Sequence, residues 1–255
     1  MKIDNKFALV TGAGSGLGEA TARALAAKGA KVAVLDLDFG AAEKVAKAIG
    51  GFAVSADVSD SGQVEDAFSK VQAEFGTAPS IIVNCAGIGT AGRILPRDGA
   101  LTTAPFERTL KVNLLGTYTV LNIAARALAV IDPLDDDGSR GVIINTASVA
   151  YEDGQIGQAA YAASKGGVAA LTLPAAREFA RLGIRVMTIA PGLFETAMSA
   201  GLPDDVRATL TQIVPFPSRM GLPEEYASLA VHIVENQMLN GTVIRLDGSV
   251  RMPPK

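Results

Sequence analysis

The chain is poor in the residues that build disulfides and metal sites. It contains one cysteine and one histidine, His232, among 255 residues. A single cysteine excludes an intramolecular disulfide framework and fits a reducing compartment, so we expect a cytoplasmic protein, with the mitochondrial matrix open for a eukaryotic source. Cysteine and histidine do not cluster at the spacings of metal ligands, and we therefore expect no metal site.

Long apolar runs and an excess of one charge are also missing. No segment of the sequence is long and apolar enough to span a membrane, so we expect no membrane partner. The formal net charge of −3 is mild and predicts no surface for nucleic acid or another polyanion. The first apolar strand is expected to begin near Phe7, which leaves no room for a removable leader before the fold.

Apolar material, in contrast, is abundant, because hydrophobic residues make up 49% of the chain and charged residues 19%. Short β-branched runs alternate with Ala-rich segments of helical spacing along the whole length. Runs without polar alternation are typical of strands buried on both faces, and hence of a parallel sheet covered by helices. The predicted strands span residues 7–12, 31–36, 52–57, 80–87, 141–148, 184–192 and 242–248.

This alternation predicts an α/β fold of the doubly wound Rossmann type, with a parallel seven-stranded sheet and helices on both faces. We expect one NAD-binding domain over residues 1–255, because the sequence shows no linker, repeat or low-complexity tract. Three prolines and a short helical piece interrupt the alternation at residues 193–220. We expect a substrate loop or lid there.

The glycine string TGAGSGLG lies between the first predicted strand and the first predicted helix. Gly12, Gly16 and Gly18 allow a tight turn and the close approach of a pyrophosphate to a helix N-terminus, where free N–H groups favour anions. The second strand ends in Asp36, whose carboxylate can accept both ribose hydroxyls of an adenosine and would repel a 2′-phosphate. No basic residue directly follows Asp36, and position 15 is Ser15, so the sequence favours NAD over NADP.

Polar and small residues end the next three strands at the same edge of the predicted sheet. Asp57 ends the third strand, where its carboxylate could accept from the adenine amino group. Asn84, Ala86 and Gly87 end the fourth, and small residues there admit a flat ligand. Ser148 ends the fifth. Ligands of open α/β sheets bind beyond the carboxyl ends of the strands, so we expect these residues to line one site.

The stretch AYAASKGG places Tyr161 and Lys165 on one face of a helix, with small residues around them. A tyrosine and a lysine at this spacing often occur by chance, and a surface lysine packed on a ring is the simple alternative. Asn113 lies within LKVNLLGTY, where an interior Asn on an apolar helix costs stability unless it is hydrogen-bonded. Tyr161 and Lys165 therefore indicate a functional site only in combination with other motifs of the chain.

Taken together, the motifs resemble the short-chain dehydrogenase/reductase family. The resemblance covers the whole chain in order and implies an oxidoreductase that moves a hydride between a nicotinamide cofactor and a secondary alcohol or ketone. The motifs that carry it are TGAGSGLG, Asp57, NCAG, Asn113, Ser148, YAASK and the PG at residues 191–192.

The resemblance implies a catalytic role for each of four residues. Tyr161 would be the general acid/base, and Ser148 would hydrogen-bond the substrate oxygen. Lys165 would hold the nicotinamide ribose. Together with the positive nicotinamide, it would lower the phenol pKa from its ordinary value of about 10. Asn113 would hold a water that connects Lys165 to solvent.

The resemblance also implies a set of residues that contact the cofactor. Thr196 matches the family position that contacts the nicotinamide carboxamide. The full set is Gly12, Ser15, Gly16, Leu17, Gly18, Asp36, Asp57, Val58, Asn84, Ala86, Gly87, Tyr161, Lys165, Pro191, Gly192 and Thr196.

Within the family, the stretch from NTASVA to NGTVIRLDGSVRM closely resembles NAD-dependent, homotetrameric members that act on short 3-hydroxyacyl-CoA thioesters and oxidise some hydroxysteroids. PGLFET and PFPSR are less widespread than YxxxK and are therefore the more specific signals. The resemblance implies conversion of 3-hydroxyacyl-CoA to 3-ketoacyl-CoA in fatty acid metabolism. It weakens at residues 92–104 and 197–212, which would shape the substrate mouth.

Two other functions stay open at this point. One is a 3-ketoacyl-carrier-protein reductase, or a hydroxysteroid or other alcohol dehydrogenase of the same fold, although Asp36 argues against an NADPH-dependent reductase. The other is a redox-silent dinucleotide sensor or scaffold. Such a protein has no need of Asn113, Ser148, Tyr161 and Lys165 together.

The helices that carry Asn113 and Tyr161 predict self-association. Apart from one polar face, the residues of both helices are apolar or small, as in NLLGTYTVLNIAARALAV and GVAALTLPAAREFA. Two such helices cannot both bury every apolar side against one sheet, so part of that surface should be covered by another subunit. The family resemblance implies a homotetramer of D₂ symmetry.

Overall fold

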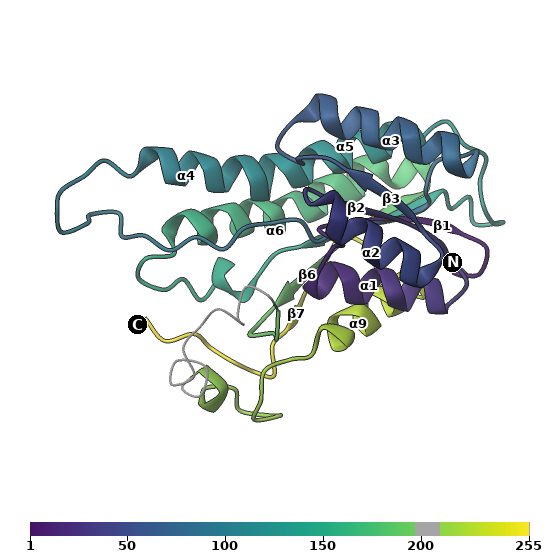
Figure 1. Cartoon of the computed structure of the whole chain (residues 1–255). Coiled ribbons are helices and arrows are strands. Elements are labelled where there is room, and N and C mark those ends of the chain that lie inside the picture. The colour runs from purple at the N-terminus through teal and green to yellow at the C-terminus, as the bar shows by residue number, and fades with distance from the viewer. Residues whose placement is uncertain (197–209, 255) are drawn as a thin grey trace.

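The structure, a computed structural model, describes residues 1–196 and 210–254. A sheet of seven parallel strands lies at its centre, in the order β3-β2-β1-β4-β5-β6-β7. Helices cover both faces of this sheet (Figure 1). The strand order reverses direction after β3, when β4 pairs with β1 on its free side. The predicted doubly wound fold is therefore confirmed.

All seven predicted runs contain a strand, but several strands end earlier than the apolar run. β4 stops at Asn84 and β5 at Thr146, so Ala86, Gly87 and Ser148 lie in loops beyond the sheet. These loops form the carboxyl edge, where ligands of such folds bind. The strands are β1 (Phe7–Thr11), β2 (Lys31–Asp36), β3 (Phe52–Ser55), β4 (Ile81–Asn84), β5 (Gly141–Thr146), β6 (Ile184–Pro191) and β7 (Val243–Leu246).

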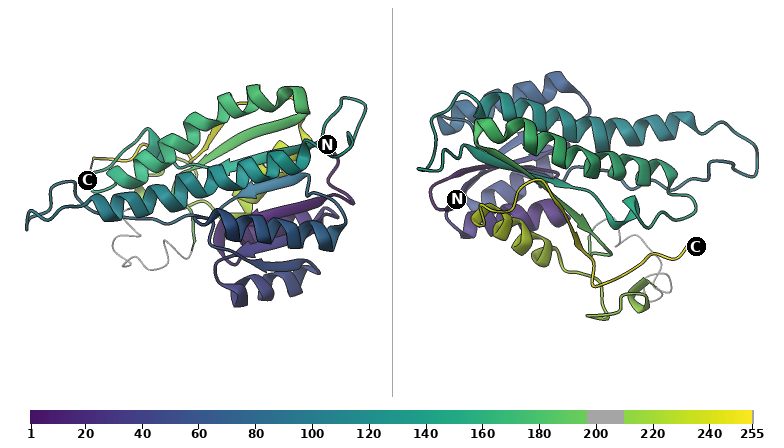
Figure 2. Two further views of the ribbon diagram at one scale, coloured as in Figure 1. Left: turned by 90° about the horizontal axis from the view of Figure 1, so that it is seen from above. Right: turned by 180° about the vertical axis from the view of Figure 1, so that it is seen from behind.

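The helices form one layer on each side of the sheet (Figure 2). Helices α1 (Gly16–Ala27), α2 (Phe39–Ile49) and α9 (Pro223–Glu235) cover one face, and α3 (Ser61–Phe75), α5 (Gly116–Leu128) and α6 (Ala159–Phe179) cover the other. Successive strand residues point to opposite faces. In β1, for example, Ala8 and Val10 pack with the first layer and Leu9 with the second. Burial on both faces explains the unbroken apolar runs.

A π-helical turn, η1 (Lys111–Leu115), joins α4 (Thr103–Leu110) to α5. In it the N–H of Gly116 donates to the carbonyl oxygen of Lys111, five residues earlier. Such single turns are frequent at functional sites because they rotate one residue out of the helical register. Asn113 lies in this turn and is fully buried. The sequence pattern predicted a helix here but not its π turn.

Two segments lie beyond the carboxyl edge of the sheet. The loop before α4 extends from the body of the molecule (Figure 2), and its Ile94 and Leu95 are exposed. In the predicted lid, Phe194 pairs with Gly221 in an isolated bridge. Residues 197–209, which include nearly half of the predicted lid and most of the predicted mouth segment 197–212, lie outside the described residues. No helix in the described ranges is long and apolar enough to cross a membrane.

Candidate active site

The glycine string forms a tight turn between β1 and α1. Gly12 adopts a φ of 61°, which glycine reaches without strain. A Cβ atom at this position would lie 2.8 Å from the Cα of Ala86, so the turn packs directly on the loop after β4. By helix geometry, the N–H groups of Gly16, Leu17 and Gly18 have no partner within α1, which makes this turn a candidate phosphate site.

Asp36, the last residue of β2, is held beside the glycine string. Its Oδ2 accepts a hydrogen bond from the N–H of Gly14 at 2.9 Å, and its Oδ1 accepts from the N–H of Asp38 at 3.1 Å. A carboxylate oxygen can accept two hydrogen bonds, so both oxygens keep capacity for a ribose hydroxyl. The carboxylate is thus fixed in orientation and available at the position predicted for the adenosine.

Asp57 and Val58 follow β3 but differ in what they offer a ligand. The Oδ1 of Asp57 accepts from the N–H of Ser59 at 2.8 Å, which holds the carboxylate at the carboxyl edge. Val58 is buried and packs against the start of α5, because a Cβ on Gly116 would lie 2.8 Å from its Cγ2. Only its backbone is therefore available to a cofactor.

Asn84 is the last residue of β4, as predicted, but its side chain points into the protein interior. Its side chain is buried, and its Nδ2 donates to Oδ1 of Asn145, its register partner on β5, at 2.9 Å. The Oδ1 of Asn84 and the Nδ2 of Asn145 have no hydrogen-bond partner among the described residues. Asn84 thus joins two central strands, and the residues after it, Ala86 and Gly87, form the edge that the sequence predicted for a flat ligand.

Helix α6 carries Tyr161 and Lys165 on one face, as the spacing predicted. The Nζ atom of Lys165 lies 5.8 Å from the centroid of the Tyr161 ring. It donates a hydrogen bond to the carbonyl oxygen of Thr146, the last residue of β5, at 2.8 Å. Lys165 is 5% exposed, whereas Tyr161 is half-buried. A solvated surface lysine, the simple alternative, is therefore excluded.

Burial perturbs both side chains. It lowers the pKa of Lys165 to about 8, because desolvation disfavours the ammonium. It raises the pKa of Tyr161, and a hydrogen bond from Ser148 acts in the opposite direction. The expected lowering of the Tyr161 pKa is thus not a property of the protein alone. The Lys165 ammonium is directed to the Thr146 carbonyl oxygen, which leaves the positive nicotinamide as the main charge to favour phenolate.

Ser148 begins the turn that follows β5. It is the N-cap of η2 (Val149–Tyr151), and its Oγ accepts from the N–H of Ala150 at 3.2 Å. Its side chain also hydrogen-bonds to Tyr161. The two hydroxyls that the sequence assigned to substrate contact therefore lie next to each other, although they come from different elements.

Asn113 satisfies its side chain entirely with protein groups. Its Oδ1 accepts from the N–H of Ile88 at 2.8 Å, and its Nδ2 donates to the carbonyl oxygen of Ile88 at 3.0 Å and to Oγ of Ser164 at 3.1 Å. Asn113 thus fastens the loop after β4 to α6. A Cβ on Gly87 in this loop would lie 3.5 Å from Nζ of Lys165, so the absence of a side chain there keeps the space beside Lys165 open.

The residues after β6 come back to the glycine string. The N–H of Gly192, just after Pro191, donates to the carbonyl oxygen of Leu246 at 2.9 Å. Thr196 lies beside Gly16, because a Cβ on that glycine would be 3.5 Å from Cβ of Thr196. The predicted nicotinamide contact and the predicted phosphate turn are therefore neighbours, although they are far apart in sequence.

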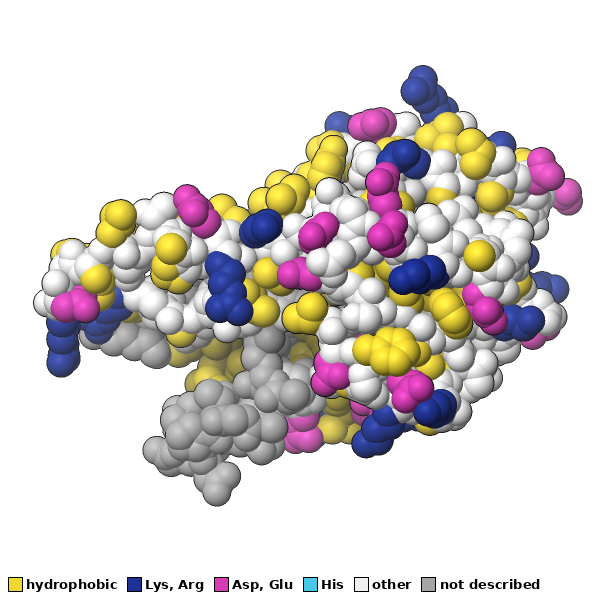
Figure 3. Space-filling model, turned by 45° about the horizontal axis from the view of Figure 1, so that its top comes forward, with side chains coloured by type: hydrophobic (Ala, Val, Ile, Leu, Met, Phe, Trp, Pro, Cys, Tyr) yellow, Lys and Arg dark blue, Asp and Glu magenta, His cyan; other side chains and the backbone are white. Residues whose placement is uncertain are grey.

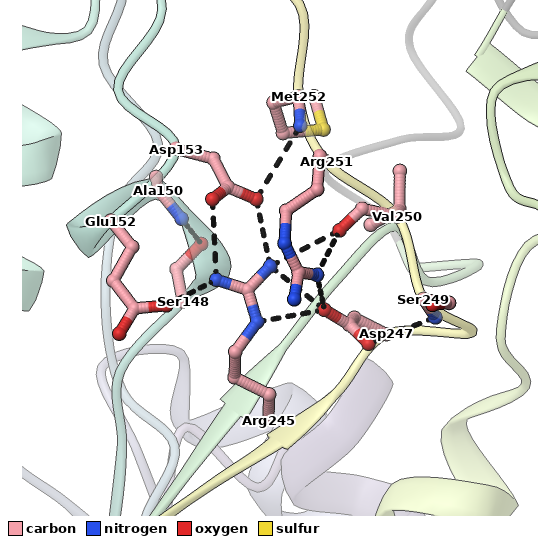
Figure 4. Close-up of polar contacts among 10 residues, drawn as sticks. All are labelled: Ser148, Ala150, Glu152, Asp153, Arg245, Asp247, Ser249, Val250, Arg251 and Met252. Atoms are coloured by element: carbon pink, nitrogen blue, oxygen red, sulfur yellow. Dashed lines mark hydrogen bonds and ion pairs between the residues drawn. The ribbon is translucent and has the colours of Figure 1, made fainter.

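Sequence reasoning missed two contributors to the site. Thr146 supplies the carbonyl oxygen that holds Lys165, and a backbone atom leaves no signal in the sequence. Arg245 on β7 meets the turn after Ser148 through ion pairs to Glu152 and Asp153 (Figure 4). An arginine within the apolar run VIRL was the available signal, since a charge in a strand needs a partner.

Metal chemistry has no visible basis in the described part of the chain. Across these residues, no group of three or more His, Cys, Asp and Glu side chains could hold an ion. The geometry instead combines a phosphate-type turn, a carboxylate for ribose and two adjacent hydroxyls beside a buried lysine. This arrangement suits proton transfer to or from a substrate oxygen next to a dinucleotide.

Comparison with known families agrees with this geometry. A model of the family described as short chain dehydrogenase matches residues 6–207. The chain therefore belongs to the short-chain dehydrogenase/reductase family of oxidoreductases. Membership and the Rossmann sheet together imply a nicotinamide dinucleotide cofactor.

Individual relatives narrow the comparison. The chain is 50% identical over 257 residues to 3-hydroxyacyl-CoA dehydrogenase type-2 of Bos taurus, an alignment that covers 99% of this chain and 97% of the relative. It is 49% identical to the protein of that name from Homo sapiens, with the same coverage. The crystal structure of 3-hydroxyacyl-CoA dehydrogenase type-2 from Mycobacterium avium superposes with a TM-score of 0.92 at 38% identity and covers 98% of both chains.

Proposed function

We propose that this chain is an NAD-dependent dehydrogenase that oxidises 3-hydroxyacyl-CoA thioesters to 3-ketoacyl-CoA. Relatives near 50% identity over almost the full length of both chains carry the name 3-hydroxyacyl-CoA dehydrogenase type-2, which supports the substrate class. The observation that carries the chemistry is the meeting of Ser148, Tyr161 and Lys165 at the carboxyl edge, beside the dinucleotide turn.

In the proposed reaction, Tyr161 accepts the proton of the 3-hydroxyl group while Ser148 donates a hydrogen bond to the same oxygen. A bound nicotinamide would supply the acceptor for the hydride that leaves the carbinol carbon. The substrate loses one proton and one hydride, so the hydroxyl becomes a ketone. Tyr161 then passes its proton towards solvent along the Lys165 side of the site, and the reverse sequence reduces the ketone.

Lys165 has two tasks in this proposal. Its ammonium adds to the nicotinamide charge, which is the main charge that favours the phenolate, and its donors hold the nicotinamide ribose. Since burial lowers the pKa of Lys165 to about 8, a bound ribose and the Thr146 carbonyl oxygen would keep the group protonated by accepting its hydrogen bonds. Asn113 contributes by holding the loop after β4 against α6, which keeps Gly87 clear of the ammonium.

Cofactor choice rests on Asp36. Its carboxylate is fixed by the N–H groups of Gly14 and Asp38 and so cannot turn away from the ribose position. A 2′-phosphate there would face a negative charge at short range, which is costly away from bulk water. We therefore propose NAD as the cofactor in preference to NADP.

We also propose a homotetramer. Leu115 is 48% exposed, Tyr118 46% and Leu173 44%, although all three lie on the long helices of the catalytic side. Figure 3 shows hydrophobic side chains reaching the surface of the molecule. Such groups on paired helices are typical of a two-fold interface between subunits.

The single cysteine forms no disulfide, which supports a cytoplasmic or mitochondrial-matrix location.

NADH absorbance with a substrate panel tests the function. The purified chain is incubated with NAD or NADP and with each enantiomer of short 3-hydroxyacyl-CoA thioesters, the matching acyl-carrier-protein thioester, a hydroxysteroid and simple secondary alcohols. We expect the highest kcat/KM with NAD and one enantiomer of a CoA thioester. Preference for NADP and the carrier-protein thioester would indicate the reductase, and turnover of nothing in the panel would contradict the proposal.

A further inference from the structure

The turn that carries Ser148 lies outside the sheet. β5 ends at Thr146, and the chain then forms η2. Within the turn, the N–H of Ala150 bonds to Oγ of Ser148, and the N–H of Tyr151 bonds to its carbonyl oxygen. These local bonds fix the shape of the turn. They do not hold it in place relative to the sheet.

Arg245 attaches the far end of the turn to β7 (Figure 4). It lies on the edge strand β7, and its side chain is 16% exposed. Its Nη1 donates to Oε2 of Glu152 at 2.6 Å and to Oδ1 of Asp153 at 3.3 Å, and its Nη2 donates to Oδ2 of Asp153 at 2.7 Å. A guanidinium that binds one carboxylate with two parallel bonds fixes direction as well as distance. The end of the Ser148 turn is therefore held against β7.

The remaining donors of Arg245 go to the C-terminal segment. Its Nε donates to Oδ2 of Asp247 at 2.8 Å, and its Nη2 donates to the carbonyl oxygen of Val250 at 3.1 Å. A guanidinium has five N–H groups, so every donor of Arg245 has a protein acceptor. One side chain thus joins the Ser148 turn to the end of the chain.

The C-terminal segment also contacts the turn directly. The N–H of Met252 donates to Oδ2 of Asp153, the same oxygen that binds Arg245. Further along, Nε2 of Gln155 donates to the carbonyl oxygen of Pro253, and the N–H of Ile156 donates to that of Pro254, both at 3.0 Å. Residues 250–254 therefore run beside residues 153–156 and depend on the same arginine.

Charge favours this arrangement. Burial opposes ionisation of Asp153, but its hydrogen bond to Arg245 and the positive charge of Arg245 outweigh that effect and lower its pKa. The pKa of Glu152 is lowered by hydrogen bonds from Tyr151 and Arg245. Both carboxylates are therefore ionised at neutral pH. Removal of the arginine would leave the nearly buried Asp153 without its counter-charge, which is strongly unfavourable.

We propose that Arg245 is a positioning residue for Ser148 and that it couples the C-terminal segment to the turn that carries Ser148. The proposal rests on the proposed function, in which Ser148 holds the substrate oxygen. The start of the turn stays attached to β6 through the hydrogen bond from Ala147 to Ile189. Without Arg245 its far end loses its attachment to β7, and the alignment of Ser148 with Tyr161 becomes less well fixed. The glycine string and Asp36 lie at the ends of other strands and make no contact with Arg245 in the described structure, so dinucleotide binding should change much less than turnover.

The test compares Arg245→Met and Arg245→Lys with the parent chain at full length. For Arg245→Met, kcat should fall by about 10- to 100-fold, as for a catalytic group displaced by about 1 Å. Arg245→Lys should be intermediate, since lysine keeps the charge but loses the planar fork. The Kd for NADH, from its fluorescence, should stay within about twofold. The Ser148 hydrogen bond lowers the pKa of Tyr161, so its loss should move the acid limb of the kcat profile for alcohol oxidation to higher pH.

Arg251→Gln is the matched control. Arg251 bonds to Asp247 and to the carbonyl oxygen of Val250 in the same segment, but its side chain is 65% exposed and contacts no residue of the Ser148 turn in the described structure. We expect its kcat and pH profile to match the parent. If Arg245→Met does not fold, Asp153→Asn removes the same ion pair from the side of the turn and should give the same pattern.

Hydrogen exchange provides a readout independent of the substrate. Backbone amides of residues 148–157 should exchange faster in Arg245→Met than in the parent, and at parent rates in Arg251→Gln. Because kcat is measured with any secondary alcohol that the parent oxidises, failure on CoA thioesters would count against the proposed function and not against the role of Arg245. An unchanged kcat, acid limb and exchange rate in Arg245→Met, or equal changes in Arg251→Gln, would overturn the inference.

Discussion

Replacement of Lys165 by methionine should make the fold more stable while it removes turnover. The ammonium of Lys165 is almost completely buried. Burial lowers its pKa from 10.5 to about 8, so the folded state binds this proton less tightly than the unfolded chain does. At neutral pH the charged lysine therefore opposes folding. Methionine has a similar length and carries no charge.

The magnitude follows from two opposing terms. A change from 10.5 to about 8 corresponds to roughly 3 kcal/mol, at about 1.4 kcal/mol per pKa unit. Methionine also deprives the carbonyl oxygen of Thr146 of its hydrogen bond from Nζ, at a cost of about 1–2 kcal/mol. The free energy of unfolding should thus increase by about 1–2 kcal/mol. For a chain of this size, that is a rise in Tm of about 2–8 °C.

The stability difference between Lys165→Met and the parent should depend on pH. Below pH 8 lysine is protonated in both states, and the penalty is complete. Between pH 8 and 10.5 the folded protein releases the proton while the unfolded chain keeps it, so the parent gains stability as pH rises. The advantage of Lys165→Met should therefore be largest near pH 7 and should disappear above pH 10.5.

Urea unfolding at pH 7 and pH 10, at one fixed protein concentration, measures this difference. Lys47→Met is the control, because Lys47 is exposed and only pairs with Glu43 on the surface. Its effect should stay within about 0.5 kcal/mol at both pH values. A Lys165→Met protein that is less stable than the parent at pH 7, or a gain that does not change with pH, would refute the assigned burial penalty.

Three further changes have defined outcomes. Asp36→Ala should weaken the binding of NAD and remove the charge that repels the 2′-phosphate of NADP. The ratio of kcat/KM for NAD to that for NADP should therefore fall, and a constant ratio would contradict the role of Asp36. Tyr226→Phe removes a buried hydroxyl that lies 2.6 Å from Oγ1 of Thr146 and should lower the free energy of unfolding by about 1 kcal/mol, measured by urea titration. Leu115→Glu places a charge on the proposed subunit interface, and light scattering after size exclusion should detect smaller assemblies, whereas an unchanged mass would argue for another interface.

The sequence predicted the layers of this fold because burial on both faces leaves an unmistakable pattern. Each predicted run contained a strand, and the strand ends brought Asp36, Ser148 and the residues after Asn84 to one edge. The side-chain direction of Asn84 was not predictable. It depends on the pairing of Asn84 with Asn145 across two strands, and strand order is not written in the local pattern.

Two structural details of the site could not be predicted from the sequence either. The π turn around Asn113 has no distinct sequence signal, because the extra residue shifts the phase of the apolar pattern once and leaves an ordinary helical pattern on either side. The position of Arg245 beside the Ser148 turn depends on β7 packing next to β6, so the ion pairs span more than ninety residues of sequence. The sequence thus identified residues whose side chains could take part in catalysis or binding, and the tertiary structure determines which of them lie in contact.

The rate of NADH formation by Tyr161→Phe tests the central claim most directly. The substitution keeps the ring and removes the group that carries the proton. With NAD and a short 3-hydroxyacyl-CoA, turnover should fall by at least about 10²-fold, while the Kd for NADH stays near that of the parent. Tyr118→Phe, which removes an exposed phenol on α5, should retain parent turnover. Turnover of Tyr161→Phe within a few-fold of the parent would contradict the account.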